Sequence, residues 1–166
     1  MRVGTVLSVE EYLNTSFQPD CDFIDGEVVE RNVGKLRHAY ALSQVGAWFV
    51  HCGLLQPLLT MSLRIGKARV RVADVAVTEI PMPEEEVITS PPYLCIEIMS
   101  PEDTMAGMQD RIDDYLQFGV PNVWVIDPWK HRGWRVSAEG WATAIDGIMR
   151  TADGRVAMPL KDVLLP

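Results

Sequence analysis

Apolar residues along the chain follow two different periodicities, and each predicts a different element. Between residues 35 and 51 they recur at intervals near those of a helix, with no proline, and Gly53 supplies a stop. Residues 93–99 instead form an almost continuous apolar run, which is typical of a strand covered on both faces. The pattern predicts one long helix packed on a sheet and a fully buried strand.

A strand–helix–strand unit is predicted around this buried run. Ser100 suits an N-cap, Pro101 suits the first helical position, and Gly119 ends the apolar helical pattern. Residues 123–126 form a second short apolar run. Two strands joined by a helix at this spacing should be parallel, with a right-handed crossover.

Shorter elements complete the predicted fold. Ser8 and Glu11 form a capping box, so a short helix should begin there and run to about Asn14. Pairs of β-prone runs flank turns at Asp25-Gly26, Gly66-Lys67, Glu139-Gly140 and Asp153-Gly154. The prediction is an α/β fold with a mixed β-sheet flanked by helices, and no repeat or linker interrupts it.

Composition agrees with one globular domain over residues 1–166, since 48% of residues are hydrophobic and 23% are charged. No apolar run approaches the roughly 20 residues that span a bilayer. Residues 1–4 lack the features of a signal peptide. Cys21, Cys52 and Cys95 show no metal-type spacing and are expected to be reduced thiols. We therefore expect a cytoplasmic protein with no membrane association.

Net charge opposes nucleic acid as a partner, because the chain carries a formal charge of −8 and phosphate neutralisation drives such binding. The basic residues are nevertheless clustered. They form three groups: Arg64, Lys67, Arg69 and Arg71; Arg31, Lys35 and Arg37; and Lys130, Arg132 and Arg135. A local basic groove and ordinary solvated charges both account for these groups.

Two acidic residues interrupt apolar strands and are the strongest chemical signal. Glu97 lies in the middle of the run 93–99, and Asp74 lies in the middle of the run 70–77. Because an unpaired buried carboxylate costs several kcal/mol, each needs a cation or hydrogen-bond donors. Acids on neighbouring strands suit an oxygen-ligand site for Mg²⁺ or Mn²⁺. The alternative is that both form salt bridges with buried arginine or lysine.

Several blocks of sequence, in order, resemble those of one known family. They are Phe23–Glu27, His38, Val72–Val77, Ile96–Pro101, and Tyr115 with Phe118–Pro128. The series is similar to the Uma-type family of restriction endonucleases, a branch of the PD-(D/E)XK nuclease superfamily, over roughly residues 7–136. The resemblance implies a restriction-endonuclease-like core with metal-binding acids on adjacent strands.

The resemblance also implies roles for individual residues. Asp74 and Glu97 fall on the family's metal-binding acids, and the backbone carbonyl of Ile98 would join them. Asp22 falls where the family has an acid that completes the site. His38 falls on a histidine that the family often shows, although a capping or packing role explains it equally well.

Two positions depart from the family pattern. Ala73 stands where the family mostly has proline, which alters backbone stiffness but not chemistry. Met99 stands where the superfamily has a catalytic lysine; in this branch the lysine lies four residues before Tyr115, where this chain has Arg111. Arginine can stabilise charge on a phosphate but cannot act as a base.

Two functions remain open from the sequence. The first is metal-dependent hydrolysis of phosphodiester bonds in nucleic acid, with DNA as the expected substrate, in which Arg111 neutralises phosphate charge. The second is a degenerate nuclease fold that acts as a binding or regulatory module. Trp129, Trp134 and Trp141 are compatible with a homodimer surface or, equally, with core packing.

Overall fold

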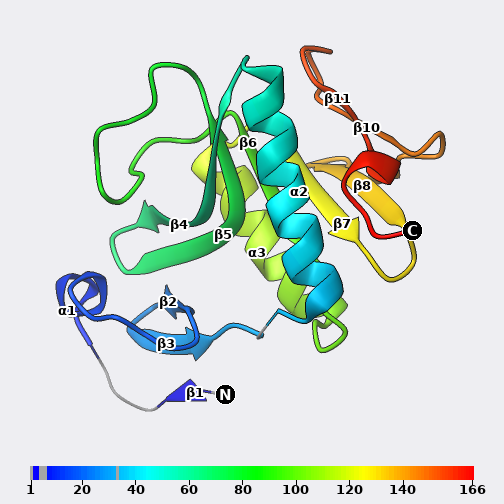
Figure 1. Ribbon diagram of the computed structural model, residues 1–166. Helices are drawn as coiled ribbons and strands as arrows, with labels where there is room; N and C mark the ends of the chain where they lie inside the picture. The colour runs from blue at the N-terminus through cyan, green and yellow to red at the C-terminus, as the bar shows by residue number, and fades with distance from the viewer. Residues whose placement is uncertain (1, 4–6, 33) are drawn as a thin grey trace.

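The computed structural model describes residues 2–3, 7–32 and 34–166. Its centre is a twisted sheet containing β4 (Gln56–Gly66), β5 (Arg69–Thr78), β6 (Leu94–Ile98) and β7 (Val123–Asp127) (Figure 1). β5 is antiparallel to β4 and to β6, whereas β6 and β7 are parallel. The predicted mixed sheet and the parallel pair around a helix are therefore confirmed.

Two helices cover opposite faces of this sheet (Figure 1). α2 (Leu36–Cys52) ends at Gly53, whose left-handed conformation (φ 65°) suits a residue without a side chain. α3 (Met105–Phe118) connects β6 to β7 and ends at Gly119 in the same conformation (φ 98°). The C-terminal ends of both helices are those that the sequence predicts.

The predicted start of α3 is wrong by four residues. Thr104, not Ser100, is the N-cap, and its hydroxyl accepts a hydrogen bond from the Gly107 N–H. The Ser100 N–H instead donates to the Asp103 carboxylate at 2.7 Å. This bond closes a turn between β6 and the helix, so the helix begins only after the turn is complete.

Each helix defines one hydrophobic core. The core under α2 contains Ala41, Val45, Phe49, Val75, Val77, Ile96, Ile98, Trp124 and Ile126. The core under α3 contains Ala73, Ala76, Cys95, Met108, Ile112, Tyr115, Val123 and Val125. Neighbouring residues of β6 and β7 fall into opposite cores, because side chains alternate across a strand. Glu97 shares the α3 side of β6 with Cys95.

Five further strands extend the sheet at its two ends: β1 (Arg2–Val3), β2 (Cys21–Ile24), β3 (Glu27–Glu30), β8 (Arg132–Ser137) and β9 (Gly140–Thr143). β10 (Ile148–Arg150) and β11 (Ala157–Pro159) form a separate two-stranded sheet. The short helix α1 (Val9–Leu13) and the 3-10 helix η1 (Leu160–Asp162) complete the described elements. The capping box of α1 is present, and the described hairpins turn within one residue of the predicted positions. β3 ends at Glu30.

One edge of β5 is divided between two strands. β4 occupies the opposite edge, whereas β2 pairs with Arg69 and Val70, and β6 pairs with residues 75–77. Residues 71–74 lie between these two partners and have no strand beside them on this edge among the described elements. Buried backbone groups at such a gap need side-chain partners, because leaving them unpaired is costly.

Two expectations from composition can be compared with the structure. None of the described helices is long and apolar enough to cross a bilayer. The three cysteines are free, as expected. Cys95 is buried in the core under α3, Cys21 is buried in a third cluster with Tyr12 and Phe23, and Cys52 is exposed at the end of α2.

Candidate active site

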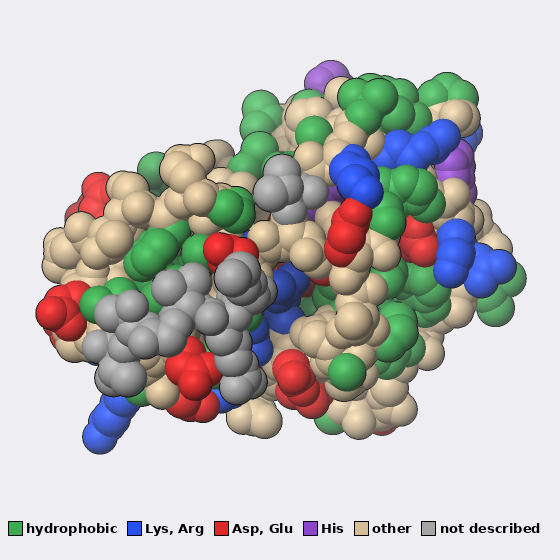
Figure 2. All heavy atoms as spheres, turned by 90° about the horizontal axis from the view of Figure 1, so that it is seen from below, with side chains coloured by type: hydrophobic (Ala, Val, Ile, Leu, Met, Phe, Trp, Pro, Cys, Tyr) green, Lys and Arg blue, Asp and Glu red, His purple; other side chains and the backbone are tan. Residues whose placement is uncertain are grey.

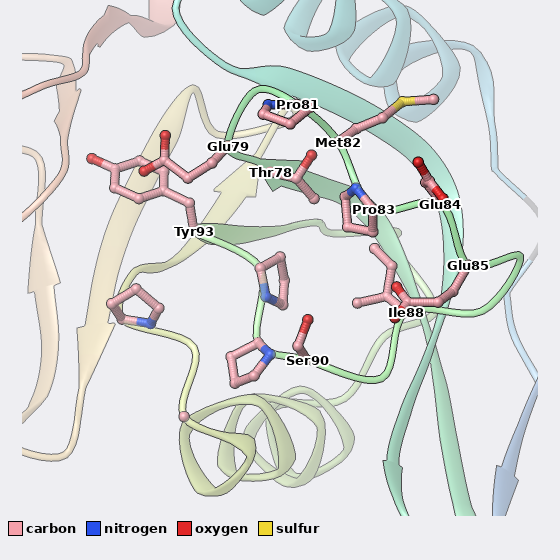
Figure 3. Close-up of a pocket in the computed structure, with 14 residues that line it drawn as sticks. Thr78, Glu79, Pro81, Met82, Pro83, Glu84, Glu85, Ile88, Ser90 and Tyr93 are labelled. Carbon is pink, nitrogen blue, oxygen red and sulfur yellow. The ribbon is translucent and has the colours of Figure 1, made fainter.

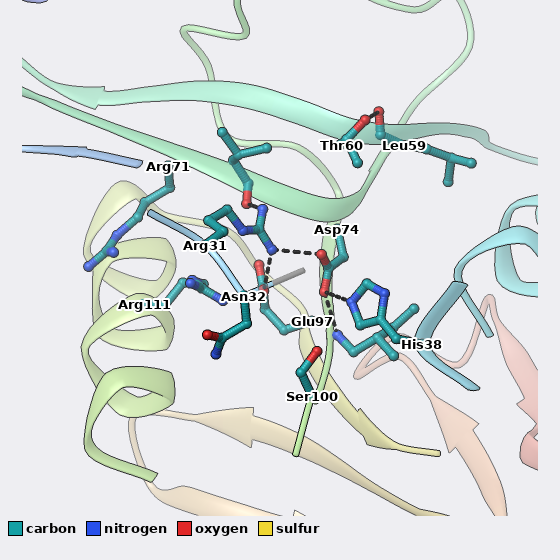
Figure 4. A network of polar contacts seen from close by, with 12 residues as sticks. Arg31, Asn32, His38, Leu59, Thr60, Arg71, Asp74, Glu97, Ser100 and Arg111 are labelled. Carbon is teal, nitrogen blue, oxygen red and sulfur yellow. Dashed lines mark hydrogen bonds and ion pairs between the residues drawn. The ribbon is translucent and has the colours of Figure 1, made fainter. Parts of the chain in front are cut away.

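Asp74 on β5 and Glu97 on β6 converge on one guanidinium (Figure 4). The Nη2 atom of Arg31 lies 2.6 Å from Asp74 Oδ1 and 3.4 Å from Glu97 Oε2. These two distances limit the separation of the carboxylate oxygens to about 6 Å. The structure therefore brings together the two acids that the sequence singles out, on one side of the sheet.

The second oxygen of Asp74 is held by its surroundings. It accepts the Ile98 N–H at 2.7 Å and lies 3.4 Å from His38 Nε2. Gly34 lies against the imidazole, since a Cβ there would be 2.7 Å from Nδ1. Burial opposes ionisation of Asp74, but Arg31, His38 and the Ile98 N–H together lower its pKa to about 2. Asp74 is therefore a fixed anion at neutral pH.

Glu97 is fully buried, and its partners come mainly from α3. Its Oε2 accepts from Arg111 Nη1 at 2.9 Å, and its Oε1 accepts from the Tyr115 hydroxyl at 2.6 Å. Arg111 and Tyr115 are one helical turn apart and so share a face of α3. Burial raises the pKa of Glu97 despite both arginines, and the negative charge of Asp74 adds to this increase. The fold thus shifts the pKa values of these two neighbouring acids in opposite directions.

Asp22, on β2, occupies the gap in the β5 edge. Its carboxylate accepts the Val72 N–H at 2.9 Å and pairs with Arg71 at 2.9 Å. The Val72 carbonyl accepts from Arg31, so both backbone groups of this residue have side-chain partners. Asp22 is connected to Glu97 through Arg111, which lies 3.5 Å from Asp22 and contacts both acids. The sequence places Asp22 at the site, and here its partners are arginines.

Each buried acid of this network forms an ion pair with at least one arginine. The carboxylates are those of Asp22, Asp74, Glu97 and Asp114, and the guanidinium groups are those of Arg31, Arg69, Arg71 and Arg111. Among the described residues, no three His, Cys, Asp or Glu side chains are grouped to bind one metal ion. The observed pairing is the salt-bridge alternative that the sequence leaves open.

The donors themselves still suit a divalent cation. Asp74 and Glu97 supply two hard carboxylate oxygens close together, which is the ligand type that Mg²⁺ and Mn²⁺ prefer. The position between those oxygens is taken by the Arg31 guanidinium, whose side chain is 10% exposed. A cation therefore fits this donor pair once that guanidinium has moved.

The network opens onto a cleft of about 280 Å³ between the β2–β3 hairpin and the start of α3. Its lining includes the buried or half-buried side chains of Asp22, Arg31, Arg71 and Arg111, together with the more exposed acids Glu30, Glu102, Asp103 and Asp110. Figure 2 shows this face, with basic side chains inside a hollow and acidic side chains around it. The cleft thus has cations inside and acids at its mouth.

Two polar links join the walls of this cleft. Asn32 Nδ2 donates to Asp103 Oδ1 at 2.7 Å, and Lys35 pairs with Glu102. Both links connect the segment between β3 and α2 to the turn before α3. Arg31 lies at the beginning of that segment, next to Asn32. The links therefore hold this segment across the cleft beside the guanidinium.

A larger cleft, of about 900 Å³, lies elsewhere and has a different character (Figure 3). It is bordered by the loop of residues 79–92, with several prolines, Glu79, Glu84, Glu85 and Tyr93. None of the site residues predicted from the sequence is among its described lining residues. Chemistry, not cleft size, therefore identifies the candidate site.

The sequence finds most of this site but misses three arginines. Asp74, Glu97, Arg111 and His38 all reach the network, whereas Arg31, Arg69 and Arg71 stand only in the basic clusters of the sequence analysis. Arg71 carries the same signal as Asp74, since it is a charged residue within an apolar strand. Arg31 carries no such signal, because it follows a half-exposed hairpin strand.

The architecture defines a class of protein. A mixed sheet with helices on both faces and paired acids on adjacent strands is a nuclease-type α/β fold. The crystal structure of "a putative nuclease belonging to DUF820" from Anabaena variabilis has this fold: it superimposes with a TM-score of 0.78, at 18% identity, over 95% of this chain and 97% of that chain.

Residues 9–144 match the Uma2 family, whose description is "Putative restriction endonuclease". The chain belongs to this family, as the resemblance of its sequence blocks indicates. None of the curated proteins compared with the chain matches it. Fold and family therefore agree on a nuclease-type domain.

Proposed function

We propose that this protein is a metal-dependent nuclease that hydrolyses phosphodiester bonds in nucleic acid, with DNA as its substrate. One observation carries the proposal: Asp74 and Glu97, from adjacent strands, place their carboxylates against a single atom of Arg31. Membership of a family of restriction endonucleases supports the same reaction and the same substrate class.

The residues of the network divide the work of the proposed reaction. Asp74 and Glu97, with the backbone carbonyl of Ile98, would hold Mg²⁺ or Mn²⁺. When bound, the cation would supply the Lewis acidity that activates water and offsets charge on the phosphate. His38 orients Asp74, because its imidazole contacts the oxygen that also accepts the Ile98 N–H. Arg111 would stabilise charge that develops on the phosphate.

The test is cleavage of plasmid DNA, and of RNA in parallel, with Mg²⁺ or Mn²⁺. Asp74→Asn and Glu97→Gln should each abolish metal-dependent cleavage. Arg155→Gln is a matched control, because it removes an exposed ion pair with Glu79 that lies outside the site. Cleavage that survives both active-site substitutions, or that needs no metal, would contradict the proposal.

A second function, that of a binding module with a degenerate site, is favoured by the arginine-matched network. A ligand that binds only the folded state must raise the melting temperature. If arginines permanently replace the metal, no cation binds, and neither Mg²⁺ nor Mn²⁺ should raise it. Wild-type protein would then cleave neither DNA nor RNA above background. A metal-dependent rise in melting temperature that disappears in Asp74→Asn would exclude this function.

Self-association is a separate expectation, and two of the tryptophans considered for its surface, Trp134 and Trp141, are half-buried. The rings of Trp134 and Trp141 meet edge to face with centroids 5.8 Å apart, and Trp141 donates to Gln109 on α3. Both tryptophans pack on the core under α3. Core packing therefore accounts for these two residues, and a homodimer stays a prediction that sedimentation analysis can test.

A further inference from the structure

We propose that Arg31 is an internal counterion of the metal site, and that a divalent cation binds only by displacing its guanidinium from Asp74 and Glu97. This inference rests on the proposed function, because it concerns the same two carboxylates. It makes cation binding an exchange of one positive charge for another instead of addition to an empty site.

Geometry places the guanidinium where a cation would be. A hard cation bound to both acids would lie about 2–2.6 Å from their oxygens. Arg31 Nη2 is 2.6 Å from Asp74 Oδ1 and 3.4 Å from Glu97 Oε2, so it occupies the space between them. A guanidinium and a cation cannot share that space, and their like charges would repel each other there.

The guanidinium is anchored by more than these acids. Its Nη1 donates to the Val72 carbonyl, at the gap in the β5 edge. Arg111 pairs with Glu97 from the other side but does not contact Asp74 in the described contacts. Arg31 is therefore the arginine that contacts both carboxylates in the described contacts, whereas Arg111 contacts Glu97 and Asp22.

The displaced side chain has a place to go. Arg31 lines the cleft of about 280 Å³, so its guanidinium can withdraw toward solvent without passing through the core. The links from Asn32 to Asp103 and from Lys35 to Glu102 join exposed side chains. Withdrawal of Arg31 therefore requires no rearrangement of the sheet.

Titration calorimetry with Mn²⁺ tests the exchange without measuring activity. Arg31→Gln should bind Mn²⁺ with a dissociation constant at least about tenfold lower than wild type, within the usual range of coupling between two sites. Arg31→Lys keeps the charge but loses the planar fork, so its affinity should fall between the two. Arg155→Gln is the matched control, since Arg155 pairs with Glu79 in an exposed ion pair outside the network.

Two further measurements identify the site and allow for a folding defect. Adding Glu97→Gln to Arg31→Gln should remove the gain in affinity, which shows that Mn²⁺ binds at this site and not to surface acids. If Arg31→Gln is unfolded without metal, Mn²⁺ should restore its folded circular dichroism spectrum, because the cation replaces the missing charge.

The result that overturns the inference is an Arg31→Gln or Arg31→Lys protein that binds Mn²⁺ no more tightly than wild type. Tight binding by Arg31→Gln, with no cleavage of nucleic acid by the wild type or by the variant, would support the exchange and refute the proposed nuclease function. Metal-dependent cleavage by wild type, with no affinity gain in Arg31→Gln, would refute the exchange and leave the nuclease function standing.

Discussion

Replacing Arg111 with alanine should lower the free energy of unfolding of this domain, and the size of the loss should depend on pH. Arg111 Nη1 lies 2.9 Å from Glu97, which is fully buried, and its Nη2 lies 3.5 Å from Asp22. At 2.9 Å and an effective dielectric constant of about 20, the attraction between Arg111 and Glu97 is about 6 kcal/mol. Relief of the desolvation of Arg111 offsets part of this loss.

The expected net loss in unfolding free energy is about 3–5 kcal/mol, the usual cost of leaving one partner of a buried ion pair alone. For a domain of this size, such a loss lowers Tm by about 6–20 °C. Without Arg111, Glu97 still has the Tyr115 hydroxyl and the more distant Arg31 as partners, and Asp22 still has Arg71. The network is therefore weakened, but each acid keeps a partner.

The pH dependence follows from the raised pKa of Glu97. At a pH below its ordinary pKa of 4.5, Glu97 is protonated in both the folded and the unfolded protein, so the pair with Arg111 contributes little. Without Arg111 the folded-state pKa rises further. The destabilisation should therefore be small near pH 4.5 and grow as pH rises through the folded-state pKa of Glu97.

Urea unfolding and calorimetry at about pH 5 and pH 8 measure this difference, and Glu97→Gln provides the cross-check. In the double variant no buried charge is left unpaired, so much of the stability lost in Arg111→Ala should return, as a coupling energy of up to about 3 kcal/mol. A loss below about 1 kcal/mol at pH 8, or a double variant as unstable as the sum of the two single variants, would refute this reasoning.

Three other predictions follow from the same network. Arg111→Lys should preserve or raise metal-dependent cleavage, whereas Arg111→Ala should lower its rate by about 10²-fold, the scale for losing one transition-state donor; equal rates for the two variants would contradict this role. Asp74 has an ordinary pKa of 3.8 that the fold lowers to about 2, so it adds stability above pH 3.8 that is lost as pH falls through about 2. Asp74→Asn should flatten this part of the acid-unfolding curve, followed by circular dichroism, and an unchanged curve would count against the assignment. Tyr115→Phe removes a 2.6 Å bond to Glu97 and should cost about 1.5–3 kcal/mol in urea unfolding, without loss of secondary structure.

Local chemistry explains which parts of the fold the sequence predicts correctly. Gly53 and Gly119 end their helices because each adopts a left-handed conformation that glycine enters at little cost. The hairpin turns likewise depend on residues adjacent in sequence. The start of α3 is predicted less well, because Ser100 and Thr104 are both competent N-caps. The Ser100 N–H donates to the Asp103 carboxylate in a turn, so Thr104 takes the role of N-cap.

By itself, the sequence determined that two carboxylates would be buried on neighbouring strands. A charged residue inside an apolar run is costly whatever its partner, so Asp74 and Glu97 are visible without knowledge of the fold. The partner was decided only by tertiary structure. Arg31 is 43 residues from Asp74 and 66 from Glu97, and it reaches both through the gap that β2 and β6 leave along β5. Such a gap is a property of strand pairing between distant segments, and no local pattern of residues encodes it.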